Sequence, residues 1–236
     1  MHFDWESLTD SVHRCRLPFL DVTVGVVQGC NGALLVDTGT TLTEAQAIRN
    51  DVREFAGQDV SHVVLTHKHF DHVLGSGVFR DAERYCAPEV LDCLTAQTDG
   101  LRDDALSYGA NEAEVYCAIA ALRPPQHAVD DAVIDLGNRQ VAIARPGRGH
   151  TDADLIVIAR GVTGEPTVVF TGDLLEESGD PAIDGDSDVE DWPETLDRLL
   201  TLGGSEAIYV PGHGAVVDMT FIRRQQEWLR ANRRKP

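Results

Sequence analysis

Three histidines and one aspartate lie between His67 and His72 in the segment THKHFDH, which follows an apolar run. Imidazole and carboxylate groups together are ligands that suit zinc, iron or manganese. His67 and His69 are two residues apart, so in an extended segment they point the same way and can reach one ion. Asp71 and His72 come at the turn into the next expected helix and can reach a second ion. The spacing predicts a metal site directly after this apolar run.

Three further groups follow apolar runs: His150 after VAIARPGRG, Asp173 after TVVFTG and His213 after AIYVPG. Each run predicts a strand that stops near a glycine-containing turn, and strand ends that converge at one edge of a sheet often build a site. Together with the first four groups they are too many for one tetrahedral zinc ion, which takes about four ligands. They suit two ions that share one carboxylate and hold a hydroxide between them. The remaining histidines, His2, His13, His62 and His127, are predicted to be structural or exposed.

The elements that must position these groups are short strands, most of them followed by helices. Strands are expected over residues 22–27, 32–39, 59–67, 83–88, 132–137, 140–146, 155–160, 167–173 and 206–214. Helices are expected over residues 41–57, 70–79 and 191–203, in the C-terminal tail, and with unclear edges over residues 89–122. Two sheets covered on their outer faces by helices suit this order, and no linker divides the chain, so we expect one domain over residues 1–236.

The composition narrows the class of partner. A formal net charge of -19 disfavours nucleic acid and anionic membrane surfaces, so a small-molecule substrate is expected, and a homodimer is left open. The chain has no apolar run long enough to cross a membrane and no leader-like apolar segment, which predicts a cytoplasmic protein. Its five cysteines form no CxxC pair, so neither a disulfide framework nor a cysteine zinc site is expected.

The series THKHFDH, GRGHT, FTGD and VPGHG resembles the metallo-β-lactamase-fold superfamily, from the DTG segment at Asp37 onward. The resemblance implies an α/β (α+β) fold, a four-layer αββα sandwich of two mixed sheets flanked by helices. It implies two zinc ions per chain, with iron or manganese as alternatives. The first ion would be bound by His67, His69 and His150, and the second by Asp71, His72 and His213, with Asp173 bridging. Asp37 would support the site by hydrogen bonding.

The function implied by this resemblance is hydrolysis of an ester, thioester, lactone or amide by a metal-bridging hydroxide, with Asp71 as a ligand that also orients or accepts a proton. True β-lactamases of this fold have cysteine or serine where this chain has Asp173, so the chain resembles the glyoxalase II and lactonase branch more. Alternatives are a mononuclear iron oxygenase resembling persulfide dioxygenases, a β-lactamase, a phosphodiesterase or nuclease, and a protein that keeps a metal only for folding.

Two regions are candidates for setting specificity. The segment Glu176–Asp191 is half acidic, which indicates a solvated loop or, alternatively, a negative rim that repels anionic substrates. The helical stretch Glu89–Leu122 contains Tyr108 and Tyr116 and is either ordinary packing or a lid over the site.

Overall fold

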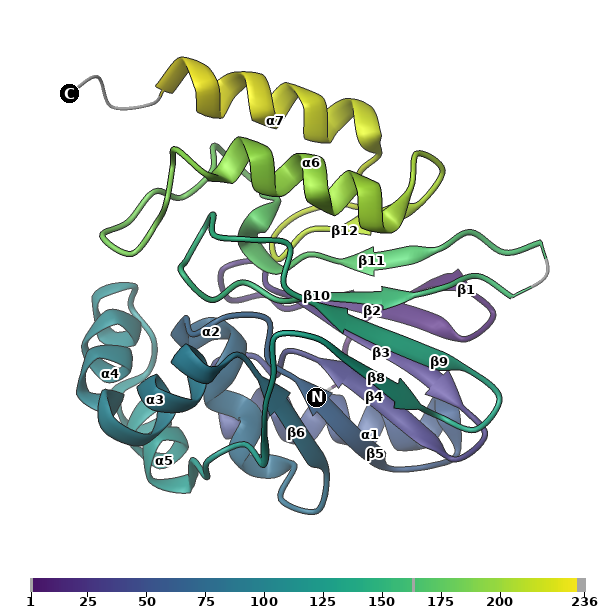
Figure 1. Ribbon diagram of the computed structural model, residues 1–236. Helices are drawn as coiled ribbons and strands as arrows, with labels where there is room; N and C mark the ends of the chain where they lie inside the picture. Colours follow the sequence, from purple (N-terminus) through teal and green to yellow (C-terminus); the bar gives the residue numbers. More distant parts are fainter. Residues whose placement is uncertain (1, 163, 233–236) are drawn as a thin grey trace.

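Two mixed β-sheets pack face to face in the computed structural model, which describes residues 2–162 and 164–232 (Figure 1). The first sheet has the order β1-β2-β3-β4-β5-β6-β7, in which β1 to β4 are antiparallel and β4 to β7 run parallel. Its strands are β1 (Trp5–Thr9), β2 (Val12–Arg16), β3 (Thr23–Gly29), β4 (Gly32–Val36), β5 (Val60–Val64), β6 (Glu83–Cys86) and β7 (His127–Ala128).

The second sheet has the order β12-β11-β10-β9-β8. Only the β11 and β12 pair is parallel, and the other neighbours are antiparallel. Its strands are β8 (Ala132–Asp135), β9 (Gln140–Ala144), β10 (Ile156–Ala159), β11 (Val168–Phe170) and β12 (Ile208–Val210). Because β10 runs opposite to both β9 and β11, the carboxyl ends of β9, β11 and β12 lie at one edge.

Helices cover the outer faces of both sheets. In Figure 1, α6 and α7 lie over the second sheet, and α1 lies beneath the first with α3 to α5 beside it. The α-helices are α1 (Leu42–Ala56), α2 (Phe70–Val73), α3 (Pro88–Ala96), α4 (Thr98–Ser107), α5 (Glu112–Ala121), α6 (Trp192–Gly203) and α7 (Met219–Asn232). Two short 3-10 helices are η1 (Leu74–Val78) and η2 (Gly172–Leu174). No helix in the described part of the chain is long and apolar enough to cross a membrane.

Alternating side chains of the second sheet divide between two apolar clusters. Val157 and Phe170 belong to the large core that the two sheets share, whereas Ile156, Ile158 and Val169 pack with the buried side chains of α6 and α7. Successive residues of a strand point to opposite faces, so a strand that is apolar at every position is covered on both. The continuous apolar runs of the sequence are explained by this double burial.

The predicted αββα sandwich of two mixed sheets is confirmed, and some local features differ from the sequence expectations, among them the short strand β7, which was not predicted. The hairpin formed by β1 and β2 was not predicted, because its strands are short and carry several charged residues. The helix expected over residues 70–79 is one α-helical turn followed by η1, since Gly75 and Gly77 have low helix propensity. A Cβ on Gly75 would overlap the Thr38 carbonyl, so this segment approaches its neighbour closely. The diffuse helical stretch resolves into α3, α4 and α5.

Candidate metal centre

All seven candidate ligands lie where strands stop. His67 follows β5, His69 is the N-cap residue of α2, and the next two, Asp71 and His72, lie within that short helix. His150 follows β9, Asp173 lies in η2 after β11, and His213 follows β12. The sheet order therefore explains why residues up to 146 positions apart meet at one edge.

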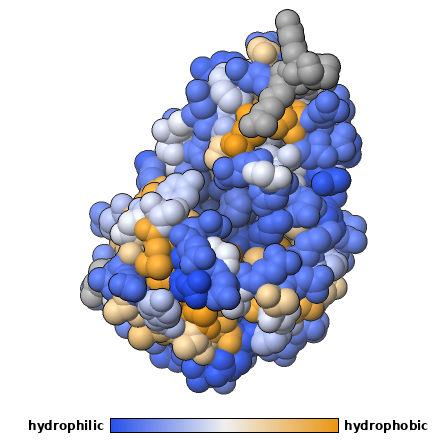
Figure 2. All heavy atoms as spheres, turned by 90° about the vertical axis from the view of Figure 1, so that its left-hand side faces the viewer, coloured by the Kyte–Doolittle hydropathy of each residue, from blue (hydrophilic) through white to orange (hydrophobic). Residues whose placement is uncertain are grey.

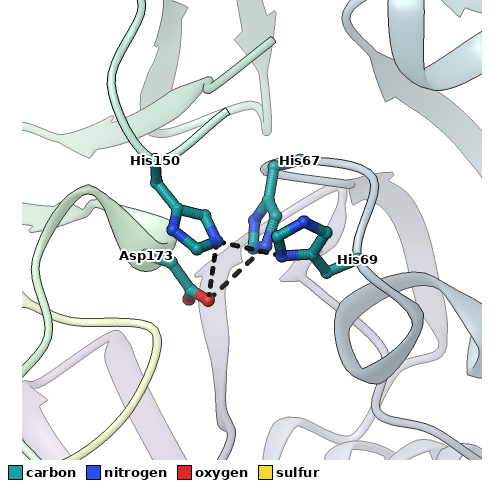
Figure 3. Close-up of side chains that lie close together, drawn as sticks. All are labelled: His67, His69, His150 and Asp173. Atoms are coloured by element: carbon teal, nitrogen blue, oxygen red, sulfur yellow. Dashed lines mark hydrogen bonds and ion pairs between the residues drawn. The ribbon is translucent and has the colours of Figure 1, made fainter. Parts of the chain in front are cut away.

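Four side chains form the first group: His67, His69, His150 and Asp173. Figure 3 shows their side chains converging, with His67 and His69 on one loop and His150 and Asp173 each on another. His69 Nδ1 lies 2.9 Å from His150 Nε2, and Asp173 Oδ2 lies 3.5 Å from His67 Nε2 and 3.3 Å from His150 Nε2. One ligand atom from each of the four lies within 4.8 Å of the others, a spacing that surrounds a single ion.

The second group consists of Asp71, His72 and His213, whose ligand atoms also lie within 4.8 Å of one another. His72 Nε2 and His213 Nε2 are 3.4 Å apart, and Asp71 Oδ2 lies 3.5 Å from His213 Nε2. Asp173 reaches this group as well, since its Oδ1 lies 3.2 Å from His72 Nε2 and its Oδ2 lies 3.3 Å from His213 Nε2. Its carboxylate thus lies between the two groups, as a bridging ligand would.

Unsatisfied polar atoms test whether these residues fit metal ions. His67 Nε2 and Asp173 Oδ1 are buried and have no hydrogen-bond partner among the described residues. Buried polar atoms without partners are rare and costly, so an orphaned pair facing a shared space indicates a ligand. The converging ring nitrogens of His69 and His150 point to the same conclusion, because two lone pairs at 2.9 Å repel each other unless a cation or proton lies between them. The donor set fits divalent metal ions.

The ring nitrogens that face away from the centre are held by neighbouring groups. His72 Nδ1 lies 2.9 Å from Asp37 Oδ2, and His213 Nδ1 lies 2.7 Å from the Leu20 carbonyl oxygen. The other three contacts join His67 Nδ1 to Thr66 Oγ1 at 3.0 Å, His150 Nδ1 to the Ala182 carbonyl oxygen at 3.3 Å, and His69 Nε2 to Asp186 Oδ2 at 3.5 Å. Such contacts fix the ring orientation and the tautomer of a ligating histidine.

Asp37 forms hydrogen bonds beside the centre, in agreement with the supporting role that the family resemblance implies. It is 2 % exposed, and its backbone φ of 60° lies in the left-handed region, which costs energy for a residue with a Cβ. Its carboxylate accepts hydrogen bonds from the Thr66 amide and hydroxyl, both at 2.8 Å, and faces His72. The strained turn after β4 therefore braces the loop that carries His67 and orients the ring of His72.

Burial and mutual charge divide the protons of the metal-free cluster unevenly. Burial lowers the pKa of His150 to about 4. Burial also acts to lower the pKa of His213, but the charge of Asp173 outweighs it and raises that pKa to about 9. Burial opposes ionisation of Asp173, yet the surrounding imidazoles, led by His72, hold its pKa well below the usual range. The cluster is thus an ionised carboxylate among imidazoles, of which His213, with its raised pKa, would release its proton when a metal binds.

The sequence did not identify Asp186 as part of the centre. It belongs to the acidic segment Glu176–Asp191, and besides facing His69 its carboxylate lies 3.1 Å from Lys68 Nζ. Lys68 also forms a 2.8 Å ion pair with Asp152, which lies next to the loop of His150. The acidic composition of the segment was the only signal, and composition does not say which carboxylate turns inward.

A cavity of about 680 Å³ opens onto both ligand groups. Its lining includes Asp71, Asp173 and His213, together with Gly100, Leu101 and Asp104 of α4 and part of the acidic segment. The other described histidines, His2, His13, His62 and His127, belong to neither ligand group. A ligand entering the cavity therefore meets the predicted metal centre at its floor.

Comparisons with known proteins place the chain in a family. The model of the metallo-β-lactamase superfamily matches residues 17–213, so this chain belongs to that superfamily. Its fold is similar to the metallo-β-lactamase FIM-1 from Pseudomonas aeruginosa in its mono-zinc form, with a TM-score of 0.76, 17% identity, and coverage of 98% of this chain and 96% of that one.

Two curated relatives are more similar to this chain in sequence than that solved structure is. Metallo-beta-lactamase domain-containing protein 1 from Rattus norvegicus is 29% identical over 197 residues, which cover 80% of this chain and 64% of that protein. An atrochrysone carboxyl ACP thioesterase from Aspergillus fumigatus is 24% identical over 216 residues, 88% of this chain and 43% of the relative. The chain thus spans less than two thirds of the length of either relative. Its superfamily includes hydrolases, among them this thioesterase.

Proposed function

We propose that this protein is a metal-dependent hydrolase that cleaves a small acyl substrate, an ester, thioester, lactone or amide, with two divalent ions, zinc in the first place and iron or manganese as alternatives. The observation that carries the proposal is the position of Asp173, whose carboxylate faces imidazoles of both ligand groups while Oδ1 has no hydrogen-bond partner among the described residues. When bound, two ions would lower the pKa of a shared water and polarise the substrate carbonyl.

The chain's own groups supply position and proton transfer. His67, His69 and His150 would hold the ion that polarises the reacting carbonyl, and Asp71, whose carboxylate borders the cavity, would orient the attacking water and accept its proton. Hydrolysis uses one water. Its oxygen bonds to the acyl carbon, the bond from that carbon to the leaving oxygen, sulfur or nitrogen breaks, and the proton held by Asp71 passes to the leaving atom.

The test of this proposal is a panel of ester, thioester, lactone, amide and β-lactam substrates with zinc-loaded protein, with and without a chelator. Chelator-sensitive hydrolysis of at least one acyl substrate supports the proposal, and turnover should fall by about two orders of magnitude in Asp71→Ala. Full metal content together with full turnover in Asp71→Ala would remove the role given to that carboxylate. Oxygen consumption with a persulfide, in place of hydrolysis, would favour the mononuclear iron oxygenase.

We also propose that the protein works on a small molecule in a reducing compartment, the cytoplasm. Its five cysteines are all free, and Cys30 and Cys117 are exposed. Exposed thiols persist where glutathione and thioredoxin keep them reduced. Fractionation of cells that produce the protein tests this location, and recovery outside the cytoplasmic fraction would contradict it.

A further inference from the structure

The cavity over the metal centre has a charge pattern that bears on the substrate. We infer that it selects acyl compounds with an apolar chain and no anionic group, and that it favours a cationic group on the chain. This inference rests on the proposed hydrolase function and names the substrate class of the same site. It depends on the apolar side chains of the cavity walls, on the carboxylates that line the cavity, and on the ion pairs of Lys68, the one lysine in the described lining.

The cavity walls provide an apolar surface for the acyl chain of a substrate. Leu20, Phe70, Leu101 and Tyr108 line the cavity, and the rings of Phe70 and Tyr108 are in contact, with centroids 5.6 Å apart. Tyr108 is 58% exposed, so its side chain adds an accessible aromatic surface to the lining. An acyl chain would replace water on this surface, which is favourable for apolar groups and unfavourable for charged ones.

The rim carries excess negative charge. Beyond the predicted metal ligands, the lining contains four carboxylates: Asp104 from α4, and Glu176, Asp184 and Asp186 from the acidic segment. Burial raises the pKa of the Tyr108 phenol, and the negative charges of Asp184, Asp71 and Asp104 raise it further, which agrees with an acidic lining. Figure 2 shows the face that carries α4, with hydrophilic side chains gathered across its middle.

The one lysine in the described lining does not offset this charge for a ligand. Lys68 Nζ is 2.8 Å from Asp152 Oδ1 and 3.1 Å from Asp186 Oδ2, so it is already neutralised by two carboxylates. No arginine lines the described cavity. A substrate carboxylate or phosphate would thus find no unpaired cationic side chain on its way in, whereas Asp104 and Asp184 have no cationic partner in the described structure.

The carboxylates that line the cavity lie on the path by which a ligand reaches the predicted metal centre. Asp173 is 6% exposed and lines the cavity, and its buried Oδ1 has no hydrogen-bond partner among the described residues, so the cavity reaches the carboxylate that lies between the two ligand groups. Outside the two ligand groups the described lining carries four carboxylates and one paired lysine, and walls with an excess of one sign of charge concentrate ligands of the opposite sign on their way in and repel those of the same sign. The rim therefore acts as a charge filter in front of a reactive centre.

Three 4-nitrophenyl esters with the same three-methylene spacer test the filter on zinc-loaded protein. The cationic ester is 4-(trimethylammonio)butanoate, the neutral one is its isostere 5,5-dimethylhexanoate, and the anionic one is hemiglutarate, each corrected for its rate without protein. We expect kcat/KM to fall in the order cationic, neutral, anionic, with at least about tenfold between the first and the last at low salt and a smaller spread at high salt.

Two double variants test whether the selectivity for charge comes from the carboxylates that line the cavity. Asp104→Asn/Asp184→Asn should bring the three values of kcat/KM closer together, mainly through KM. Asp103→Asn/Asp131→Asn is the matched control, because it changes the net charge equally at two exposed residues outside the cavity lining. An unchanged order in the rim variant, or the same change in the control, would overturn the inference.

A binding readout is independent of turnover. Pentyltrimethylammonium should give a ligand-observed NMR saturation-transfer signal with the protein that weakens in the rim variant, and pentanesulfonate should give none. Hydrolysis of all three esters with the anionic one equal to or better than the neutral one overturns the inference alone. Hydrolysis of none of the three esters and of no member of the ester, thioester, lactone and amide panel, with zinc bound, overturns the proposed function and the inference with it.

Discussion

Asp37 Oδ2 lies 2.9 Å from His72 Nδ1, on the side of the ring that faces away from Asp71 and Asp173. This contact requires the proton to be on Nδ1, so that Nε2 keeps its lone pair for the centre. The same carboxylate accepts hydrogen bonds from the Thr66 amide and hydroxyl. One buried aspartate therefore controls the tautomer of His72 and the position of the loop that carries the next histidine, His67.

Asp37→Asn should weaken the binding of the metal held by the second group about 10- to 100-fold, with little change in secondary structure. The amide NH₂ would face the ring and favour the tautomer that blocks Nε2. Competition with a chromophoric zinc chelator measures the affinity. The control is Asp81→Asn, a side chain that is 92% exposed. Equal zinc affinity in both variants would show that the contact does not orient the ring.

Asp186→Asn should lower the zinc affinity of the first group about tenfold, because it removes the carboxylate that faces His69 Nε2 and pairs with Lys68. Asp180→Asn is a matched control on the same acidic segment, exposed and outside the cavity lining. The same chelator competition applies. If both variants behave alike, the segment contributes only charge and Asp186 does not position the histidine.

Gly212→Ala should disrupt the centre, because an added Cβ would overlap Asp173 Oδ1. We expect a loss of the zinc-induced rise in Tm, since a displaced bridging carboxylate no longer serves both groups. Gly179→Ala is the control, because no atom lies within 4 Å of a Cβ built there. A normal zinc-induced shift in Gly212→Ala would mean that Asp173 tolerates the displacement.

The buried carboxyl group of Asp154 should make the stability of the folded protein depend on pH. It is 2 % exposed, and burial raises its pKa to about 7, while two 2.9 Å hydrogen bonds from Thr151 act in the opposite direction. The unfolded value is about 3.9, so between these values the folded state binds more protons than the unfolded state. The contribution of this group to stability is therefore present below about pH 4 and is lost as the pH rises through about 7.

Asp154→Asn removes the titration, so the free energy of unfolding of the variant relative to the parent should be higher at pH 8 than at pH 5. Urea unfolding in the presence of a chelator at the two pH values measures this difference, free of metal binding. A difference that does not change with pH would show that the Asp154 carboxyl ionises normally in the folded protein.

Much of the fold followed from the sequence because the buried strands are continuous apolar runs, as in Ile156–Ala159. The start and end of α1 were also readable, since Thr41 and Glu44 form a capping box and Gly57 ends the helix at φ 67°. The hairpin of β1 and β2 was missed because half-exposed, charged strands lack that signal. Its stability comes from pairing with β3, which local patterns do not record.

The candidate ligands were readable because each follows a strand, and the structure brings all seven together at one edge. Most of the groups that contact the ring nitrogens facing away from the centre could not be predicted from the sequence. The carbonyl oxygens of Leu20 and Ala182 are backbone atoms, so no side chain marks them. Asp186 was hidden among many acids, since its role depends on how a long loop folds back onto His69.

The central claim is that Asp173 joins two metal ions at one centre. Elemental mass spectrometry of purified, metal-loaded protein tests it most directly, with Asp173→Asn measured beside the parent. The account predicts about two divalent ions per chain in the parent and one or fewer in the variant. One ion per chain in the parent, or two ions retained in Asp173→Asn, would contradict it.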